Sequence, residues 1–262
     1  MTDHSGDGWD FIISPWHLDE YIPDFPVPAS LTAVIRPDLP AEPAVARMSL
    51  LHHAIADAVA GAGRPLLLSG DCPAARGAMA GLQRRHRDLA LVWLDAHGDF
   101  NSPAITTSGY LGGMALAMLT GRTPGLLDDE LGLRPAPETS VVLGDARDLD
   151  PAERVALTAS QVRRVAADPG VLASALGGLG DMPVYLHLDI DVVDSADLPG
   201  LRFPSGPGPS LAQIEDCLAA VCATADVAGA GIACAWLPDR VGDPATRETI
   251  ARLTHALGAD LT

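Results

Sequence analysis

The sequence is poor in cationic and cysteine side chains, and each shortage argues against a class of protein. Only 17 Lys and Arg stand against 34 Asp and Glu, which gives a net charge of −17. Nucleic acids and anionic membrane surfaces attract clustered cations, so we expect neither as a partner. The 4 cysteines show no CxxC spacing, the N-terminus has no basic and apolar leader, and no apolar run is long enough to span a membrane. We therefore expect a cytoplasmic protein with reduced thiols.

Aromatic residues are also scarce, at 4%, but hydrophobic residues make up 48% of the chain and can form a core of Ala, Leu and Val. Short apolar runs alternate with segments of helical periodicity, which predicts a mainly parallel sheet covered by helices on both faces. We expect strands at 9–13, 64–70, 89–94, 140–144, 162–166, 183–188 and 227–237, and helices at 44–61, 73–85, 112–121, 151–160, 168–177, 210–223 and 243–257.

This pattern indicates one α/β domain over residues 1–262, built as a three-layer sandwich around a sheet of about eight strands. The segment 23–43 is rich in proline, and we expect it to run over the surface as a lid or a subunit contact. Ligands of open α/β sheets bind beyond the carboxyl ends of the strands, so these ends are where functional residues are expected.

Ionisable residues follow four of the expected strands. The segments after them read Gly-Asp-Cys at 70–72, Asp-Ala-His-Gly-Asp at 95–99, Asp-Ala-Arg-Asp-Leu-Asp at 145–150 and Asp-Ile-Asp-Val-Val-Asp at 189–194. Taken singly, each is as readily a loop whose acid caps the next helix. The segments 95–99 and 189–194, however, have ionisable side chains two residues apart, and such side chains lie on the same side of an extended backbone.

Carboxylates that converge in this way repel one another, and few Lys or Arg lie near these motifs to neutralise them. A pair of divalent cations would do so, with Asp95 and Asp189 bridging the two ions and His97 among the other ligands. Carboxylates with one imidazole suit Mn²⁺ better than the thiolate-rich sites that Zn²⁺ prefers. Two such ions about 3.5–4 Å apart activate a water molecule as a nucleophile, and this chemistry is typical of a hydrolase.

Two longer motifs carry a resemblance to a known family. The runs DAHGDFNSPAITTSGYLGG (95–113) and HLDIDVVD (187–194) resemble the arginase/agmatinase (ureohydrolase) family, and the similarity extends from about residue 64 to the end. The resemblance implies an arginase-like α/β fold, a di-manganese site, hydrolysis of guanidino or related C–N bonds in a small-molecule substrate, and assembly into a homo-oligomer.

The resemblance also implies roles for individual residues. Asp95 and Asp189 would bridge both Mn²⁺ ions, His97 and Asp191 would complete one shell, and Asp99 and Cys72 the other. Asn101 and Ser108 fall at positions that hold the α-carboxylate of an amino-acid substrate, although they could equally belong to a plain loop. Asp148 and Asp150 of the RDLD segment would meet an α-amino group, although Asp150 could simply cap the helix expected at 151–160.

Three positions depart from the family pattern. Cys72 stands in SGDC where the family has the histidine of GGDH, and we expect weaker or altered metal occupancy there, because Mn²⁺ prefers O and N donors. Cys72 could also be a small buried residue beside a one-metal site. Gly112 replaces the histidine that arginases use as a proton shuttle, and Ala235 replaces the glutamate that holds the guanidinium. Cys72 and the SGYLGG run point to the N-hydroxyarginine hydrolase branch of the D-cycloserine pathway.

The leading hypothesis is a metal-dependent hydrolase that converts N-hydroxy-L-arginine to hydroxyurea and ornithine by attack of metal-bound hydroxide, with Asp99 or solvent giving the departing amine its proton. An N-hydroxyguanidine is less basic than a guanidine and needs less carboxylate pairing and less general-acid help. One alternative is a conventional arginase or agmatinase, which Gly112 and Ala235 disfavour. Another is a degenerate relative that binds a ligand without catalysis.

Overall fold

The computed structural model describes residues 8–28, 31–127 and 130–259. Its main sheet has eight strands in the order β4-β1-β5-β10-β9-β6-β7-β8, and every neighbouring pair is parallel. The strands are β1 (Asp10–Ser14), β4 (Leu31–Val34), β5 (Pro65–Ser69), β6 (Ala90–Asp95), β7 (Val141–Asp145), β8 (Arg163–Val165), β9 (Val184–Asp189) and β10 (Val227–Ala233). The predicted α/β sheet of about eight strands is confirmed. An antiparallel pair, β2 (Trp16–His17) and β3 (Glu20–Tyr21), lies outside this sheet and was not anticipated.

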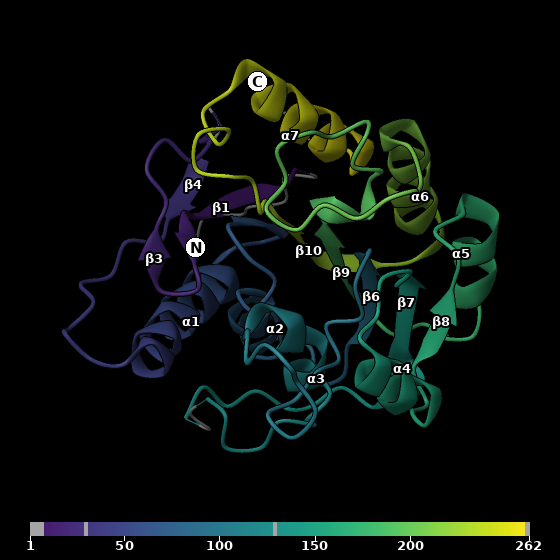
Figure 1. The fold of residues 1–262 in the computed structure, drawn as a ribbon, viewed down its shortest axis with the longest axis horizontal. Helices are drawn as coiled ribbons and strands as arrows, with labels where there is room; N and C mark the ends of the chain where they lie inside the picture. Colours follow the sequence, from purple (N-terminus) through teal and green to yellow (C-terminus); the bar gives the residue numbers. More distant parts are fainter. Residues whose placement is uncertain (1–7, 29–30, 128–129, 260–262) are drawn as a thin grey trace.

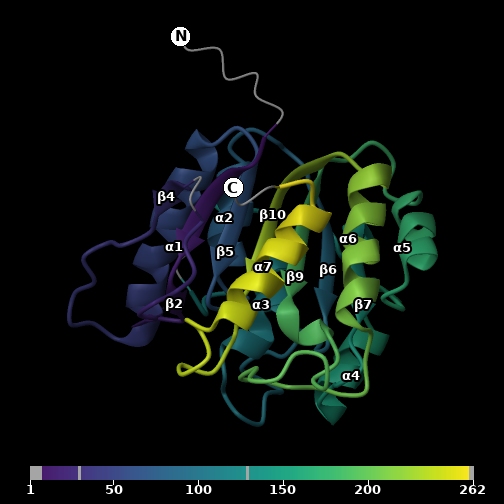
Figure 2. The same ribbon diagram turned by 90° about the horizontal axis from the view of Figure 1, so that it is seen from above.

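Helices cover both faces of the sheet, which confirms the expected three layers (Figures 1 and 2). One face carries α1 (Ala44–Gly61), α2 (Ala75–Leu82), α3 (Ala115–Leu119) and α4 (Pro151–Thr158), and the other carries α5 (Pro169–Leu176), α6 (Leu211–Thr224) and α7 (Pro244–Ala256). Several helix starts follow from local sequence. Proline is in the first turn of α4, α5 and α7, and Ser210 caps α6 by accepting a hydrogen bond from the backbone of Gln213 at 3.2 Å.

The central strands divide their side chains between two apolar clusters, as the period of a strand requires. In β6, Leu91 and Trp93 pack toward α1 and α2, whereas Val92 and Leu94 pack toward α6 and α7. All four are buried. Burial on both faces explains why this strand reads as a continuous apolar run instead of alternating with polar residues.

Three expectations about elements need correction. Residues 31–34 of the Pro-rich segment form the edge strand β4, because the proline-free run Leu-Thr-Ala-Val can pair with β1; residues 29–30 of that segment lie outside the described ranges. The expected strand 227–237 ends at Ala233, and the backbone then turns over the end of the sheet. The expected helix 112–121 is divided into a 3₁₀ turn, Gly112–Met114, and the short α3.

The topology gathers the polar strand ends at one edge of the sheet. Strands β9 and β10, although late in the sequence, lie between β5 and β6. The register pairs Ala233 with both Ser69 and Asp189, and Asp95 with Asp145, so these strand ends stand at one level. The segments 70–72, 95–99, 189–194 and 234–235 therefore begin side by side. Within the described ranges, no helix has the length and apolarity needed to cross a membrane.

The close contact between α1 and α2 depends on glycine. A Cβ on Gly81 of α2 would lie 2.6 Å from the carbonyl oxygen of Ala56 and 2.8 Å from the Cβ of Val59, both in α1. Real Cβ atoms do not approach this closely, so the two helices would have to separate.

We predict that Gly81→Ala lowers the free energy of unfolding by about 1–3 kcal/mol through overpacking, even though alanine favours helices. Urea unfolding followed by circular dichroism measures the change. Gly61→Ala, at the end of α1, is the matched control, because a Cβ there meets nothing within 4 Å. Equal stability of the two variants would contradict the packing argument.

Candidate metal centre

Two groups of potential metal ligands lie at the carboxyl edge of the sheet, and they share Asp95. The first consists of Asp95, His97 and Asp191, and the second of Cys72, Asp95 and Asp99; within each group the ligand atoms lie within 4.8 Å of one another. In the first group, His97 Nδ1 is 3.1 Å from Asp191 Oδ2 and 3.4 Å from Asp95 Oδ1. This arrangement brings together five of the six residues that the sequence predicts as ligands.

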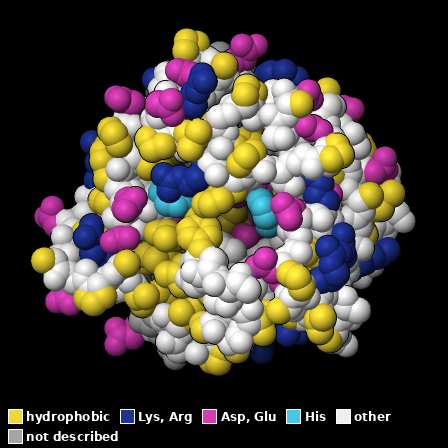
Figure 3. Space-filling model, viewed as in Figure 1, with side chains coloured by type: hydrophobic (Ala, Val, Ile, Leu, Met, Phe, Trp, Pro, Cys, Tyr) yellow, Lys and Arg dark blue, Asp and Glu magenta, His cyan; other side chains and the backbone are white. Residues whose placement is uncertain are grey.

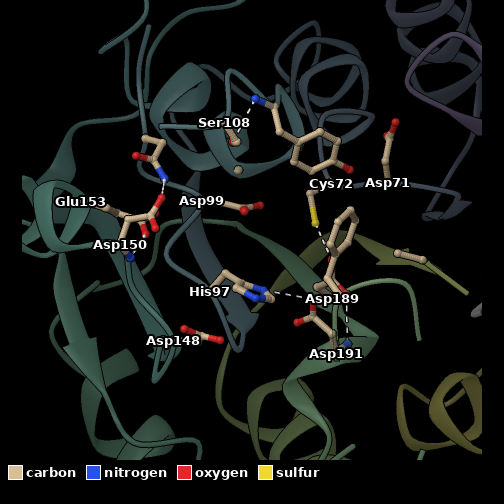
Figure 4. A pocket seen from close by; sticks show the side chains of 16 residues that line it. Asp71, Cys72, His97, Asp99, Ser108, Asp148, Asp150, Glu153, Asp189 and Asp191 are labelled. Atoms are coloured by element: carbon tan, nitrogen blue, oxygen red, sulfur yellow. Dashed lines mark hydrogen bonds and ion pairs between the residues drawn. The ribbon is translucent and has the colours of Figure 1, made fainter. Parts of the chain in front are cut away.

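The sixth, Asp189, lies against both groups but belongs to neither. Its Oδ2 accepts a hydrogen bond from the Cys72 thiol at 2.9 Å, and its Oδ1 accepts one from the backbone of Asp191 at 2.9 Å. Figure 4 shows the Cys72 sulfur directed toward Asp189. The bridging role of Asp189 stays a prediction.

The two aspartate-led motifs have a common local design. Asp95 ends β6, and its Oδ1 accepts a hydrogen bond from the backbone of His97 at 2.7 Å. Asp189 ends β9 and binds the backbone of Asp191 in the same way. Each aspartate thus fixes a tight turn that returns the residue two positions later to the same side. Asp99, further along, has a φ of 49°, a left-handed conformation that aspartate tolerates better than most residues.

The electrostatics of the cluster follow from burial and crowding. Burial raises the pKa of Asp99 and of Asp189 well above the usual range, and neighbouring carboxylates act in the same direction. Burial also raises the pKa of Asp191 to about 7, with the charge of Asp95 adding to the effect. Burial opposes a charge on His97, but hydrogen bonds with Asp191 and Asp95 outweigh it and raise its pKa to about 12.

These shifts describe a site that is short of positive charge. His97 and the carboxyl groups of Asp99, Asp189 and Asp191 therefore bind protons more readily than usual. Burial opposes the charge of Asp95, but hydrogen bonds with His97 and the charge of its ring outweigh burial and lower the pKa of Asp95. Burial and the charge of Asp189 raise the pKa of the Cys72 thiol. A bound cation would take over from these protons, and it would have to displace them.

A cavity of about 300 Å³ opens over the cluster, and Figure 3 shows this face hollowed at its centre. The predicted substrate residues Asn101, Ser108, Asp148 and Asp150 all line it. Asn101 is buried and donates a hydrogen bond from Nδ2 to Asp150 Oδ2 at 3.3 Å, whereas Ser108 and Asp148 are exposed. Asp150 also occupies the N-cap position of α4, so it lies both at the helix start and in the cavity.

Sequence reasoning missed several residues of the cavity. Glu153 accepts hydrogen bonds from the backbone of Phe100 at 2.8 Å and of Asp150 at 3.3 Å, so it ties the loop after β6 to α4. The Asp-x-x-Glu spacing at 150–153, a capping-box pattern, could have identified it. Tyr110 and Phe203 form an aromatic part of the wall, with ring centroids 5.1 Å apart. Tyr110 was visible in the SGYLGG run, but nothing in the sequence linked it to Phe203.

Comparison with known proteins bears on the origin of this arrangement. A family model described as the arginase family matches residues 19–256. The chain belongs to the arginase family. An arginase from Bacillus cereus has a similar structure, with a TM-score of 0.82 and 22% identity over 96% of this chain and 98% of that one. Proclavaminate amidino hydrolase from Streptomyces clavuligerus follows with a TM-score of 0.69 and 19% identity, over 96% and 90%. At these identities the likeness establishes the arginase-like fold.

Two sequence relatives are closer. N(omega)-hydroxy-L-arginine amidinohydrolase from Streptomyces lavendulae is 31% identical over 149 residues, 57% of this chain and 53% of that protein. Arginase from Bacillus subtilis is 34% identical over 155 residues, 53% of this chain and 50% of that protein. The chain thus spans about half the length of the curated relatives it matches.

The donor chemistry fits Mn²⁺ in one of the two ligand groups and only in part in the other. Two carboxylates and an imidazole make up the Asp95–His97–Asp191 group, which is the O and N set that Mn²⁺ accepts. In the other group, Asp99 Oδ2 is buried without a hydrogen-bond partner, as expected of an oxygen meant for a cation. The Cys72 sulfur is a poor donor for a hard ion and weakens that group.

We predict that Mn²⁺ stabilises this protein more at pH 8 than at pH 5. Because the folded protein raises the pKa of Asp191 from 3.8 to about 7, it holds a proton that the unfolded chain has lost in that interval. The free energy of unfolding without metal therefore falls as pH rises through it. Mn²⁺ needs the deprotonated ligands, so its affinity rises over the same interval.

Thermal unfolding with excess Mn²⁺ or a chelator measures the difference in Tm at each pH. Asp191→Asn should abolish most of the Mn²⁺-induced rise, whereas Asp216→Asn, an equal charge change at an exposed position on α6, should retain it. A Tm increment that is independent of pH would contradict the argument.

Proposed function

We propose that the chain is a manganese-dependent hydrolase of guanidino amino acids and that N-hydroxy-L-arginine is its substrate, with hydroxyurea and ornithine as products. The observation that carries the proposal is that two ligand groups share Asp95 and lie against one cavity. This cavity has a volume of about 300 Å³ and is lined by polar residues. Bound metal ions would supply an activated water molecule at neutral pH. Family membership supports the reaction class.

The chain's own residues would hold the substrate by its two ends. Asn101 and Ser108 offer an amide and a hydroxyl to the α-carboxylate, and Asp150 offers a carboxylate to the α-amino group. The guanidino carbon would then lie near Asp99 and His97, which line the same cavity. In the reaction a C–O bond forms at that carbon, the bond to the side-chain nitrogen of the substrate breaks, and that nitrogen leaves as the amine of ornithine.

The part of the cavity wall that contains Gly112 and Ala235 supports a weakly basic substrate. Gly112 and Ala235 bring no side-chain acid or base to the cavity, and Tyr110 and Phe203 cover this part of it with aromatic rings. Position 235 gives a charged guanidinium no carboxylate, which is costly for a buried cation, and Asp71, which also lines the cavity, is held by the backbone amides of Leu18 and Ala74. An N-hydroxyguanidine is less basic and can bind in neutral form. The relative from Streptomyces lavendulae, named for hydroxyarginine, favours the same substrate.

We predict that the Mn²⁺-loaded protein releases ornithine from N-hydroxy-L-arginine with a kcat/KM at least about tenfold higher than from L-arginine, a difference of about 1.4 kcal/mol in transition-state binding. Ornithine and hydroxyurea are quantified by chromatography, and agmatine serves as a third substrate. A preference for arginine or agmatine would favour a conventional ureohydrolase. No turnover of the three by protein that contains Mn²⁺ would favour a binding protein.

We also predict that Cys72→His raises the Mn²⁺ content of the purified protein from about one ion per chain toward two, because an imidazole nitrogen replaces a thiol in the weaker group. Metal analysis after dialysis measures the stoichiometry, and the electron paramagnetic resonance spectrum should gain the signature of two coupled ions. Cys222→Ser, away from the cavity, is the control. Wild-type protein that already holds two ions would overturn the expectation of a weakened site.

A further inference from the structure

We propose that Tyr110, backed by His17, gives the departing amine its proton in the hydrolysis proposed above, on which this inference rests. The pair would be a proton-transfer device built from a cavity wall and from the β2–β3 hairpin. Neither residue is among the predicted ligands.

The hydrogen bonds of His17 determine which ring nitrogen faces the tyrosine. The Tyr110 hydroxyl is 3.1 Å from His17 Nε2, and His17 Nδ1 is 3.0 Å from the carbonyl oxygen of Gly70. A carbonyl oxygen only accepts, so Nδ1 carries a hydrogen and Nε2 faces the tyrosine. A neutral ring then accepts a hydrogen bond from the hydroxyl, whereas a protonated ring donates one to it. The two rings stack with centroids 6.0 Å apart, and Phe203 packs against both.

The cavity offers few other donors. A ligating carboxylate must be deprotonated, and this applies to Asp99, the residue first expected to carry the proton, as a member of the Cys72 group. The Nδ2 amide of Asn101 donates to Asp150, and Ser108 is exposed. Tyr110 lines the cavity as well, is half-buried, and has a second proton-carrying group directly behind it.

Gly112 leaves the space that this tyrosine needs. A Cβ at position 112 would lie 2.2 Å from the Cε1 atom of Tyr110 and 2.5 Å from its hydroxyl oxygen. A side chain at 112 and the present position of the Tyr110 ring therefore exclude each other. In the sequence, Gly112 indicates the loss of a proton shuttle. In the structure, the same glycine leaves room for the Tyr110 hydroxyl beside the cluster.

His17 also has access to a proton supply on its other side. It lines a second cavity of about 100 Å³ together with Glu20 and Arg202, while its Nε2 contacts Tyr110 in the wall of the larger one. Asp71 lies near His17 and is held by the backbone amides of Leu18 and Ala74. A proton given up by His17 can thus be replaced by water from the smaller cavity without crossing the substrate site.

The proposed step balances. The C–O bond forms, the C–N bond breaks with its electron pair going to nitrogen, and the Tyr110 hydroxyl proton passes to that nitrogen. In its imidazolium form, His17 passes the proton on Nε2 to the Tyr110 oxygen in the same step and is left neutral with its hydrogen on Nδ1, and it then takes up a proton from water in the smaller cavity. The attacking water releases one proton to solvent, so no net proton is consumed.

We expect Tyr110→Phe to lower kcat for N-hydroxy-L-arginine about 10²-fold or more, the range of general-acid catalysis, while KM, Mn²⁺ content and Tm stay close to those of the wild type. The loss should be smaller with L-canavanine, because its departing nitrogen belongs to a weakly basic aminooxy group and needs less protonation. His17→Gln keeps an acceptor for the tyrosine hydroxyl but cannot relay a proton, so kcat should fall while KM holds.

Thr32→Val is the matched control, since it removes one hydroxyl at an exposed position of β4 that lines neither the catalytic cavity nor the smaller one. Wild-type kcat in Tyr110→Phe, or an equal loss with both substrates, would overturn the inference while leaving the proposed function intact. Wild-type kcat in His17→Gln would overturn the relay role of His17. A wild-type protein that turns over neither substrate would overturn the proposed function and this inference together.

Discussion

Mutual repulsion among buried carboxylates is the constraint on which the rest of this structure depends. Asp95, Asp99, Asp189 and Asp191 are all less than a tenth exposed at one edge of the sheet. The chain contains no lysine, and the cavity lining, among the described residues, contains no arginine. The local compensation includes the His97 imidazole, the Cys72 thiol, the Trp93 indole N–H and backbone amides. These hold the side chains in place but do not neutralise the cluster as a cation would.

The fold maintains this costly arrangement because the sheet holds two of the acids directly. Asp95 and Asp189 end strands that are buried on both faces and fixed in register, so these two cannot move apart without breaking the sheet. Asp191 is tied to Asp189 through its backbone amide. Arg147 adds a second restraint, since its guanidinium pairs with Asp145 and donates to the carbonyl oxygens of Val192 at 3.0 Å and Ser205 at 2.8 Å. This cationic side chain thus binds the backbone around Asp191, whereas the Asp191 carboxylate pairs with His97.

The parts that sequence predicted are those encoded locally. Strand and helix alternation, and the convergence of residues two apart such as Asp95 and His97, follow from periodicity and from the general location of sites in parallel sheets. The edge strand β4 was hidden because prolines surround a four-residue run. His17 and Tyr110 are 93 positions apart in the sequence, and His17 lies in a hairpin whose two strands have two residues each. No sequence spacing predicts this contact. The ligand roles themselves, and the bridging of Asp189, stay predictions.

Gly112 and Ala235 indicate lost functional side chains when the sequence is considered alone, but their surroundings in the structure change this interpretation. Gly112 makes room for the Tyr110 ring, and Ala235 lies in a wall that the rings of Tyr110 and Phe203 also form. A sequence alignment compares the side chains at one position. In a folded protein, the space left by a small residue at that position can be filled by a side chain from another part of the chain. In the proposed function, the Tyr110 hydroxyl replaces the histidine of the family pattern as a proton donor, whereas no carboxylate at position 235 replaces the glutamate as a partner for a guanidinium. The first change is compatible with hydrolysis, and the second is the ground on which we propose a substrate less basic than arginine.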